Sequence, residues 1–245
     1  MGNERSGILI QARSGSTRLP GKVFSRLILS QPLTILDFIY SRLQRVLAAD
    51  LVAFVIPEND SLLADFLSRR NYNFFKGSEQ DVRERYRQAA LHYELDTIVR
   101  ATGDNPCVDP GVAMDTLLHF QTLDCDLFSY NNLPLGVAVE VFRQAALLDN
   151  RIPETPEHCE HVSLHIKHNP QIFSVQHAAH PLMKHYPTLR PPRLTVDTTE
   201  DLAVVRGVFE VLGAEFALRD VLDLFGEGHD FFLLNQHVEQ LAFPA

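Results

Sequence analysis

The sequence is short of positive charge. Among its 245 residues, 22 are lysine or arginine and 31 are aspartate or glutamate, which gives a formal net charge of −9 at pH 7. Proteins hold the phosphate backbone of nucleic acids with positive surface, so this balance argues against a nucleic-acid partner. A local group of cations in such a chain would instead indicate a small, highly charged anion.

Cysteine and long apolar runs are also scarce. The three cysteines are an odd number without metal-type spacing, and we expect them to remain free thiols in a reducing compartment. No apolar run approaches the roughly 20 residues that a membrane-spanning helix needs. No secretory leader pattern precedes the first apolar segment. The sequence therefore predicts a cytoplasmic protein without a membrane partner.

Two common phosphate-binding motifs are missing. A Walker A loop places four residues between its first glycine and the Gly-Lys pair, followed by Ser or Thr. Here five residues separate Gly15 from Gly21, and Val23 follows Lys22. The GxGxxG spacing of dinucleotide-binding folds is also absent. These absences exclude a Walker-type loop and a dinucleotide fingerprint.

What the chain does have near its start is a cationic loop after a short apolar strand. The segment from Gly7 to Lys22 reads GILIQARSGSTRLPGK, with three cations, three hydroxyls and two glycines after the strand. Glycine lets backbone N–H groups approach an anion, and arginine and lysine neutralise it. The segment predicts a polyphosphate-binding loop. The alternative is a polar turn that exposes its cations to water.

Apolar strands alternate with amphipathic helices along the rest of the chain. The expected strands are 7–11, 51–56, 72–75, 97–101, 126–130, 137–142 and 193–197. The expected helices are 34–49, a helix capped by Asp60 and ending near Arg70, 79–93, one after Pro110, and 200–212 capped by Thr198 or Thr199. Strands separated by helices of this length are typical of an α/β protein with a largely parallel sheet.

One domain over residues 1–245 is the expected organisation, because no low-complexity linker divides the chain. Residues 143–192 are expected to leave the sheet and to form an acceptor-side or subunit surface. Within them, 151–189 holds five prolines and seven histidines, with helical spacing only around 157–168. Residues 218–245 are expected to form a helical extension.

Two carboxylates are expected at the same edge of the sheet as the cationic loop. Asp104 follows strand 97–101, and Asp197 ends strand 193–197. In open α/β sheets, ligands bind outside the carboxyl ends of the strands. Two carboxylates opposite a phosphate loop can hold Mg²⁺ between protein and triphosphate. The alternative is that each aspartate only caps the helix that follows it.

Six segments carry a family resemblance. They are IQARSGSTRLPGKV (10–23), FKGSEQDVRERYRQAA (75–90), IVRATGDNPCVDP (98–110), VAVEVF (137–142), EHVSLHI (160–166) and RLTVDTTEDLAVV (193–205). In these segments and their order, the chain resembles the cytidylyltransferases that activate sugar acids, most closely the spore coat polysaccharide biosynthesis branch. The resemblance implies a three-layer nucleotidyltransferase fold, Rossmann-type and related to GT-A glycosyltransferases, with a mixed, mainly parallel sheet. It also implies a homodimer.

The resemblance also implies roles for individual residues. It assigns CTP binding to Gln11, Ala12, Arg13, Gly15, Ser16, Arg18, Lys22, Gly77, Ser78, Asp81, Arg85, Arg100 and Gly103. It assigns Mg²⁺ to Asp104 and Asp197, and catalysis to these two together with Arg13 and Lys22. Acceptor binding falls to Asn131, Glu140, Glu160, His161 and Arg193. The implied reaction is attack of an acceptor oxygen on the α-phosphorus of CTP with release of pyrophosphate, in surface polysaccharide biosynthesis.

Several features leave alternatives open. Relatives carry an Arg and an Asp before the VEVF motif, in a segment like PRGLD, whereas this chain has PLGVA at 134–138. The chain could therefore be a nucleotide-binding protein that has lost activity. Asp124 and Asp126 form the DxD motif of GT-A glycosyltransferases, which is a second alternative. Cys159, His161 and His165 have a spacing that zinc accepts.

Glu140 lies in an apolar strand. It is expected to have a substrate or cationic partner, unless the strand is an edge that leaves it in water.

Overall fold

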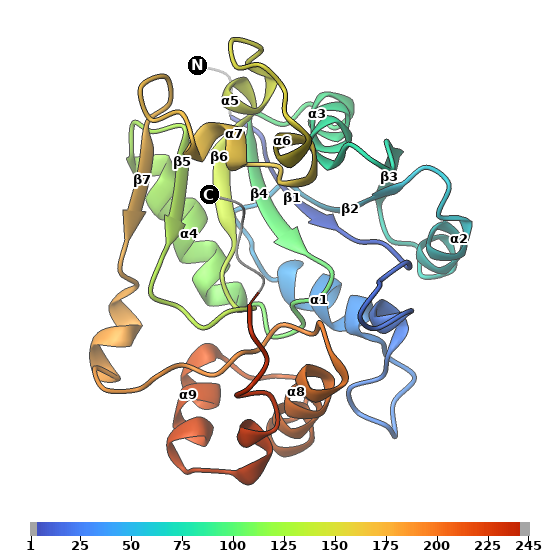
Figure 1. The fold of residues 1–245 in the computed structure, drawn as a ribbon, viewed down its shortest axis with the longest axis vertical. Coiled ribbons are helices and arrows are strands. Elements are labelled where there is room, and N and C mark those ends of the chain that lie inside the picture. The colour runs from blue at the N-terminus through green and yellow to red at the C-terminus, as the bar shows by residue number, and fades with distance from the viewer. Residues whose placement is uncertain (1–3, 241–245) are drawn as a thin grey trace.

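A mixed sheet forms the centre of the molecule (Figure 1). The computed structural model describes residues 4–240. Within this range a seven-stranded sheet has the order β3-β2-β1-β4-β6-β5-β7. The strands are β1 (Ser6–Gln11), β2 (Leu51–Pro57), β3 (Phe74–Gly77), β4 (Thr97–Thr102), β5 (Leu127–Tyr130), β6 (Glu140–Arg143) and β7 (Val175–Ala178). In the described chain only β6 runs antiparallel to its neighbours, so the sheet is mainly parallel.

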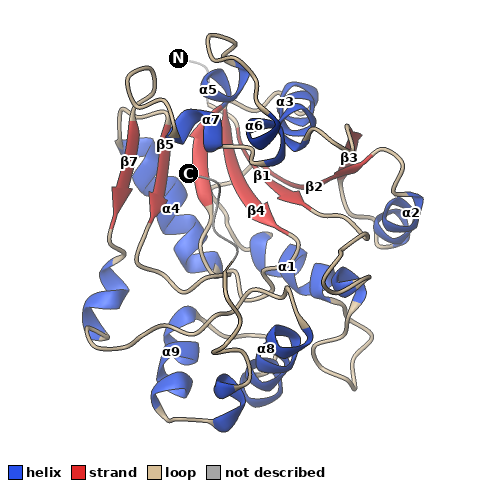
Figure 2. Cartoon of the chain, viewed as in Figure 1, coloured by secondary structure: helices blue, strands red, loops and turns tan. Residues whose placement is uncertain are grey.

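Helices cover both faces of this sheet (Figure 2). The α-helices are α1 (Ile35–Leu43), α2 (Ser61–Arg69), α3 (Val82–His92), α4 (Pro110–Thr122), α5 (Gln144–Leu148), α6 (Pro156–Glu160), α7 (Leu164–Lys167), α8 (Thr199–Leu212) and α9 (Leu218–Gly226). Short 3-10 helices are η1 (Lys22–Phe24), η2 (Pro181–His185) and η3 (Asp230–Leu233). No helix in residues 4–240 is long and apolar enough to cross a bilayer.

Alternating side chains of the buried strands divide the interior into two cores. On β1, Ile8 and Ile10 join the larger core with residues of α1, α4 and α8. Leu9 points the opposite way and joins a smaller core with Tyr86 of α3 and Ala146 of α5. Successive residues of a strand face opposite sides of the sheet, so an uninterrupted apolar run is what a strand covered on both faces requires. The expected three-layer α/β fold is confirmed.

Local capping signals located two helix starts correctly. Asp60 accepts a hydrogen bond from the backbone N–H of Leu63 and caps α2. Thr198 caps α8 in a reciprocal capping box with Asp201. Other helix boundaries in the structure differ from the predicted ones. Helix α1 ends at Leu43 instead of 49, which leaves Leu47 86% exposed although its spacing had suggested a buried face.

The expected strand 193–197 is wrong. This segment belongs to no strand and bends at residues 195 and 197. The backbone N–H of Leu194 donates to the Leu135 carbonyl (2.8 Å), and that of Val196 donates to the Asp104 carbonyl (2.8 Å). The expectation that residues 143–192 lie outside the sheet also needs correction. Strand β7 lies within them and pairs in parallel with β5. The strand expected at 72–75 lies at Phe74–Gly77.

Candidate active site

The loop that follows β1 lies where the parallel strands end. β1 and β4 are adjacent, and the backbone N–H of Gly103 donates to the Gln11 carbonyl over 2.8 Å. A Cβ at Gly103 would stand 2.9 Å from the Cβ of Ala12. Glycine is therefore required at 103, because any side chain there would push the ends of β1 and β4 apart. This contact sets the base of the loop.

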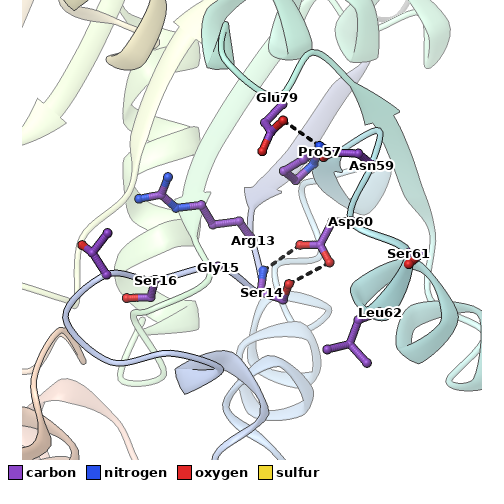
Figure 3. Close-up of a pocket in the computed structure, with 11 residues that line it drawn as sticks. Arg13, Ser14, Gly15, Ser16, Pro57, Asn59, Asp60, Ser61, Leu62 and Glu79 are labelled. Atoms are coloured by element: carbon purple, nitrogen blue, oxygen red, sulfur yellow. Dashed lines mark hydrogen bonds between the residues drawn. The ribbon is translucent and has the colours of Figure 1, made fainter.

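A pocket of about 620 Å³ opens between this loop and the start of α2. Its loop side consists of residues 13–17, and its other walls come from Pro57, residues 59–62 and Glu79. Figure 3 shows Ser14 turned toward Asp60, while the Arg13 side chain extends away from Asp60. A volume of this size suits a small-molecule ligand. Arg13, Gly15 and Ser16, all predicted to bind nucleotide, do line one pocket.

Asp60 fixes the conformation of the loop. Besides capping α2, it accepts hydrogen bonds from the backbone N–H (2.7 Å) and the hydroxyl (2.8 Å) of Ser14. The sequence suggested only the capping role, because the second partner is 46 residues away. One carboxylate thus anchors both walls of the pocket. Glu79 was also missed as a lining residue; it accepts a hydrogen bond from the Asn59 amide.

Lys22 joins the two predicted metal ligands. Gly21, with φ +68°, turns the chain into η1 and directs Lys22 inward, where it is only 8% exposed. Its ammonium donates to Asp104 Oδ2 (3.0 Å), Asp197 Oδ1 (2.9 Å) and the Val196 carbonyl (2.7 Å). Three donors meet three acceptors, so the ammonium is fully satisfied. Three residues predicted from distant segments therefore form one cluster.

Asp197 is surrounded by cations. Besides Lys22, it pairs with Arg18 (3.1 Å) and with Arg193 (2.8 Å). Burial by itself would raise the pKa of Asp197, but Lys22, Arg18 and Arg193 outweigh it and hold the pKa below its usual range. Asp197 is therefore ionised at neutral pH. Arg193, predicted to bind the acceptor, is a largely buried member of this cluster.

Asp104 and Asp197 fit the donor set of a Mg²⁺ site. Both carboxylates already converge on a single positive charge, that of Lys22. Mg²⁺ is bound through one or two carboxylates together with water and substrate phosphates, so this pair suffices. Across residues 4–240, three ligand-type side chains gather only at Asp81, Glu154 and Cys159. The suggested zinc set is not assembled, since His165 faces the Ala146 carbonyl (3.1 Å) inside the core.

The residues predicted near the base or ribose form one turn after β3. The buried Arg85 donates through Nε to the Ser78 carbonyl (2.8 Å) and through Nη2 to the Glu79 carbonyl (3.1 Å). The Ser78 hydroxyl accepts from the backbone N–H of Asp81 (3.0 Å), and Asp81 caps α3. A Cβ at Gly77 would lie 2.9 Å from Arg85 Cγ. Arg85 therefore shapes the turn beside the pocket.

A second charge network lies between β4 and β6. Arg100 donates to Gln11 Oε1 (3.3 Å) and to Glu140 Oε2 (3.3 Å). Glu140 also accepts from the Ser163 hydroxyl (2.7 Å) and the Lys167 ammonium. Burial alone would raise the pKa of Glu140, but Lys167, Arg100 and Ser163 overcome it and lower the pKa to about 2. The expected cationic partner is confirmed, and the alternative of a strand edge in water is wrong, because β6 is paired on both sides.

The predicted acceptor residues lie in four places. Glu140 belongs to the Arg100 network and Arg193 to the Asp197 cluster. Asn131 is exposed directly after β5, where its backbone N–H donates to the Ala178 carbonyl (3.1 Å). Glu160 and His161 lie at the end of α6. Ser163 and Lys167 were not predicted, although both follow in the helical segment around 157–168.

The DxD aspartates lie at the opposite edge of the sheet. Asp124 and Asp126 precede β5, which runs parallel to β4, so they stand at the amino end of the strands. Asp126 accepts from the backbone N–H of Ser174 (2.8 Å), and Asp124 is exposed. Neither is placed to serve the pocket beside β1.

The PLGVA segment braces the chain that carries Asp197. Gly136 has φ +94°, and a Cβ there would lie 2.4 Å from the Thr195 nitrogen. The backbone N–H of Leu194 also donates to the Leu135 carbonyl, and together these contacts hold residues 194–197 against the end of β4. These contacts use Gly136, which the chain shares with the family pattern, and a backbone carbonyl, so the departures at residues 135 and 138 do not remove them.

Comparison with known proteins gives a consistent result. A family model described as Cytidylyltransferase matches residues 7–203. The spore coat polysaccharide biosynthesis protein SpsF of Bacillus subtilis is 32% identical over 215 residues, covering 84% of this chain and 86% of that protein. A cytidylyltransferase structure from Leptospira borgpetersenii matches with a TM-score of 0.85 and 27% identity, covering 97% of this chain and 100% of that one.

A more distant structure shares the fold. The CMP:2-keto-3-deoxy-manno-octonic acid synthetase, solved in complex with CTP, matches with a TM-score of 0.65 and 17% identity. The match covers 85% of this chain and 100% of that one. At this identity the likeness concerns the fold alone, and it agrees with the three-layer arrangement described above.

Proposed function

The chain belongs to the cytidylyltransferase family, and we propose that it transfers CMP from CTP to a sugar, sugar acid or related acceptor, releasing pyrophosphate. The observation that carries this proposal is the cluster in which Lys22 joins Asp104 and Asp197 beside the pocket lined by residues 13–17. The name of the related SpsF supports a role in surface polysaccharide synthesis.

The chemistry needs little beyond positioning and charge. A bond forms between the acceptor oxygen and the α-phosphorus, and the bond from that phosphorus to the bridging oxygen breaks as pyrophosphate leaves. Stabilising the charge on the phosphoryl oxygens is the main catalytic task. Arg13 and Arg18 are exposed on the loop and can meet a triphosphate directly. No side chain has to act as a nucleophile.

Lys22 has a different task from the exposed arginines. Its ammonium is already satisfied, so it holds the carboxylates of Asp104 and Asp197 together and neutralises part of their charge. Asp104 and Asp197 would hold Mg²⁺, which when bound neutralises phosphate charge and polarises a phosphoryl oxygen. A homodimer belongs to the proposal, with residues 143–192 on the acceptor side or at the subunit contact. Light scattering would measure the mass of the assembly.

Pyrophosphate release tests the proposal. The protein is incubated with Mg²⁺, one of the four nucleoside triphosphates, and a panel of nonulosonic acids, sugar phosphates and phosphonates. We expect release with CTP and at least one acceptor. If CTP gives no pyrophosphate with any acceptor, the proposal fails. A glycosyltransferase or an inactive nucleotide-binding protein, the two alternatives, would give that negative result.

Asp104→Asn tests the role of the carboxylate pair. The side chain of Asp104 is 29% exposed, so we expect the variant to fold normally and to lose activity by about 100-fold, as when one electrostatic group of an active site is removed. Turnover is measured at limiting and at saturating Mg²⁺. The exposed Asp65→Asn is the matched control. Wild-type turnover of Asp104→Asn at limiting Mg²⁺ would rule out the role.

A further inference from the structure

We propose that Asn235, in the C-terminal extension, is a positioning residue that orients Asp197 through Asp201 and Arg193. The inference rests on the proposed function and deepens it, because it assigns the extension a part in the active site. The family model matches residues 7–203, so Asn235 lies beyond the matched segment. Four observations support the assignment.

Asp201 is the centre of the arrangement. It is fully buried, and each of its carboxylate oxygens accepts two hydrogen bonds. Oδ2 accepts from the backbone N–H groups of Asp197 (2.9 Å) and Thr198 (3.1 Å). Oδ1 accepts from Arg193 Nε (2.9 Å) and Asn235 Nδ2 (2.9 Å). A buried carboxylate needs all such partners, because an unmet charge in the interior is costly.

Arg193 connects Asp201 to Asp197 through its guanidinium group. Its Nη2 donates to Asp197 Oδ2 (2.8 Å), while its Nε is held by Asp201. The flat guanidinium is therefore fixed between two carboxylates, and its rotation sets the position of the Asp197 oxygen. The other oxygen of Asp197 faces Lys22 and Arg18. Asp197 is thus held from both sides, with Lys22 on one and Arg193 on the other.

Asn235 links the backbone of Arg193 to the side chain of Asp201. Its amide nitrogen donates to the Arg193 carbonyl (3.0 Å) as well as to Asp201 Oδ1. Asn235 is 3% exposed, so water does not replace these bonds easily. A neutral amide suits the position, because it offers N–H donors to Asp201 without adding another charge. An aspartate at 235 would place a further negative charge against Asp201.

Packing of η3 on α8 places Asn235 beside Arg193 and Asp201. Gly207 of α8 leaves room for the Phe231 ring, and a Cβ at 207 would stand 2.6 Å from ring atoms. Phe232 beside it is buried against the larger core. The extension therefore lies directly on α8, and the turn after η3 brings Asn235 to Arg193. Loss of Asn235 would take one hydrogen bond each from Asp201 Oδ1 and the Arg193 carbonyl and so loosen Arg193 and Asp197, although Arg193 Nη1 keeps its bond to Gln240.

The test compares Asn235→Leu with Phe232→Leu. Both change a buried side chain of the same extension, but only the first removes the hydrogen bonds to Asp201 and Arg193. Melting temperature is measured first, and Asn235→Gln serves as the conservative variant that keeps an amide. Two readouts follow: kcat and KM for CTP in pyrophosphate release, and the Kd of Mn²⁺ from electron paramagnetic resonance, with and without CTP.

We expect Asn235→Leu to lower kcat about tenfold relative to Phe232→Leu, with KM for CTP within about twofold, since small displacements of catalytic groups cost up to about 100-fold. Mn²⁺ should bind several-fold more weakly to Asn235→Leu, and Asn235→Gln should recover part of both losses. Equal kcat and equal Mn²⁺ Kd in Asn235→Leu and Phe232→Leu would overturn the inference.

The two measurements distinguish failure of the proposed function from failure of the proposed role of Asn235. If wild type releases no pyrophosphate, the proposed function fails, while the Mn²⁺ comparison still decides the role of Asn235. If wild type is active and the two leucine variants behave alike, only the role of Asn235 is lost. If wild type neither releases pyrophosphate nor binds Mn²⁺, both are overturned.

Discussion

Replacing Glu140 with glutamine tests the charge network between β4 and β6. Glu140 has an 18% exposed side chain and lies among Lys167, Arg100 and Ser163. These partners outweigh the effect of burial and lower its pKa from 4.5 to about 2. Since one pKa unit corresponds to about 1.4 kcal/mol, ionised Glu140 contributes on the order of 3 kcal/mol to the free energy of unfolding at neutral pH.

The sign of the pH dependence follows from the lowered pKa. The unfolded chain takes up this proton near pH 4.5, whereas the folded chain resists it until about pH 2. The contribution of Glu140 is therefore complete above about pH 5 and is lost as the pH falls toward 2. We expect Glu140→Gln to destabilise the protein by roughly 3 kcal/mol at pH 7. By pH 3 the difference should have shrunk to less than half.

Urea unfolding of wild type and Glu140→Gln at a series of pH values between 7 and 3 measures this difference. The exposed Glu210→Gln on α8 is the control, and it should follow wild type throughout. A Glu140→Gln curve that runs parallel to wild type over the whole range would refute the reasoning. A variant as stable as wild type at pH 7 would show that the network contributes nothing.

Two further predictions concern the interior. Burial, followed by the charge of Arg83, lowers the pKa of His165 from 6.5 to about 4, so stability should fall as the pH drops from 6.5 to 4 while the unfolded chain gains this proton. In His165→Phe, the free energy of unfolding measured with urea should depend less on pH between 6.5 and 4 than in wild type. The same pH dependence in both proteins would contradict the assignment. Gly136→Ala should cost about 3 kcal/mol by adding left-handed backbone strain and overpacking against residues 194–195. Leu135→Ala is its control, and equal melting temperatures would count against the bracing role.

Local signals predicted much of the fold, because strands and caps depend on neighbours in sequence. The apolar run of β1 and the caps Asp60 and Thr198 are such cases. The strand predicted at 193–197 was wrong for a related reason, because the alternating apolar residues of this segment are typical of a strand. Leu194 and Val196 are indeed buried, yet their N–H groups reach two separate loop carbonyls instead of a ladder. Strand β7 was missed because VQHA is a short, partly exposed edge strand with a single partner.

The sequence could nominate candidate site residues but not the partners that surround them. The cationic loop and Asp104 could be chosen from charge, glycine content and position after β1 and β4, whereas Asp197 was chosen as the end of a strand that does not form. That Lys22 would be enclosed by those aspartates depends on contacts 82 and 175 residues apart in sequence. For the same reason, the sequence did not show that Ser163 and Lys167 contact Glu140. A single sequence states which groups are available, while burial and pairing arise only when distant segments meet.

The position of Asn235 has a consequence for how the chain acquires its site during synthesis. The strands that carry the cationic loop and Asp104 emerge from the ribosome well before residue 235. Asp201 and Arg193 follow, but both still await a hydrogen bond from Asn235, and Arg193 also awaits one to Gln240. A nascent chain stalled before that point would display the loop and both carboxylates and still lack a settled Asp197. The surroundings of Asp197 are therefore complete only after the segment that carries Asn235 has packed on α8.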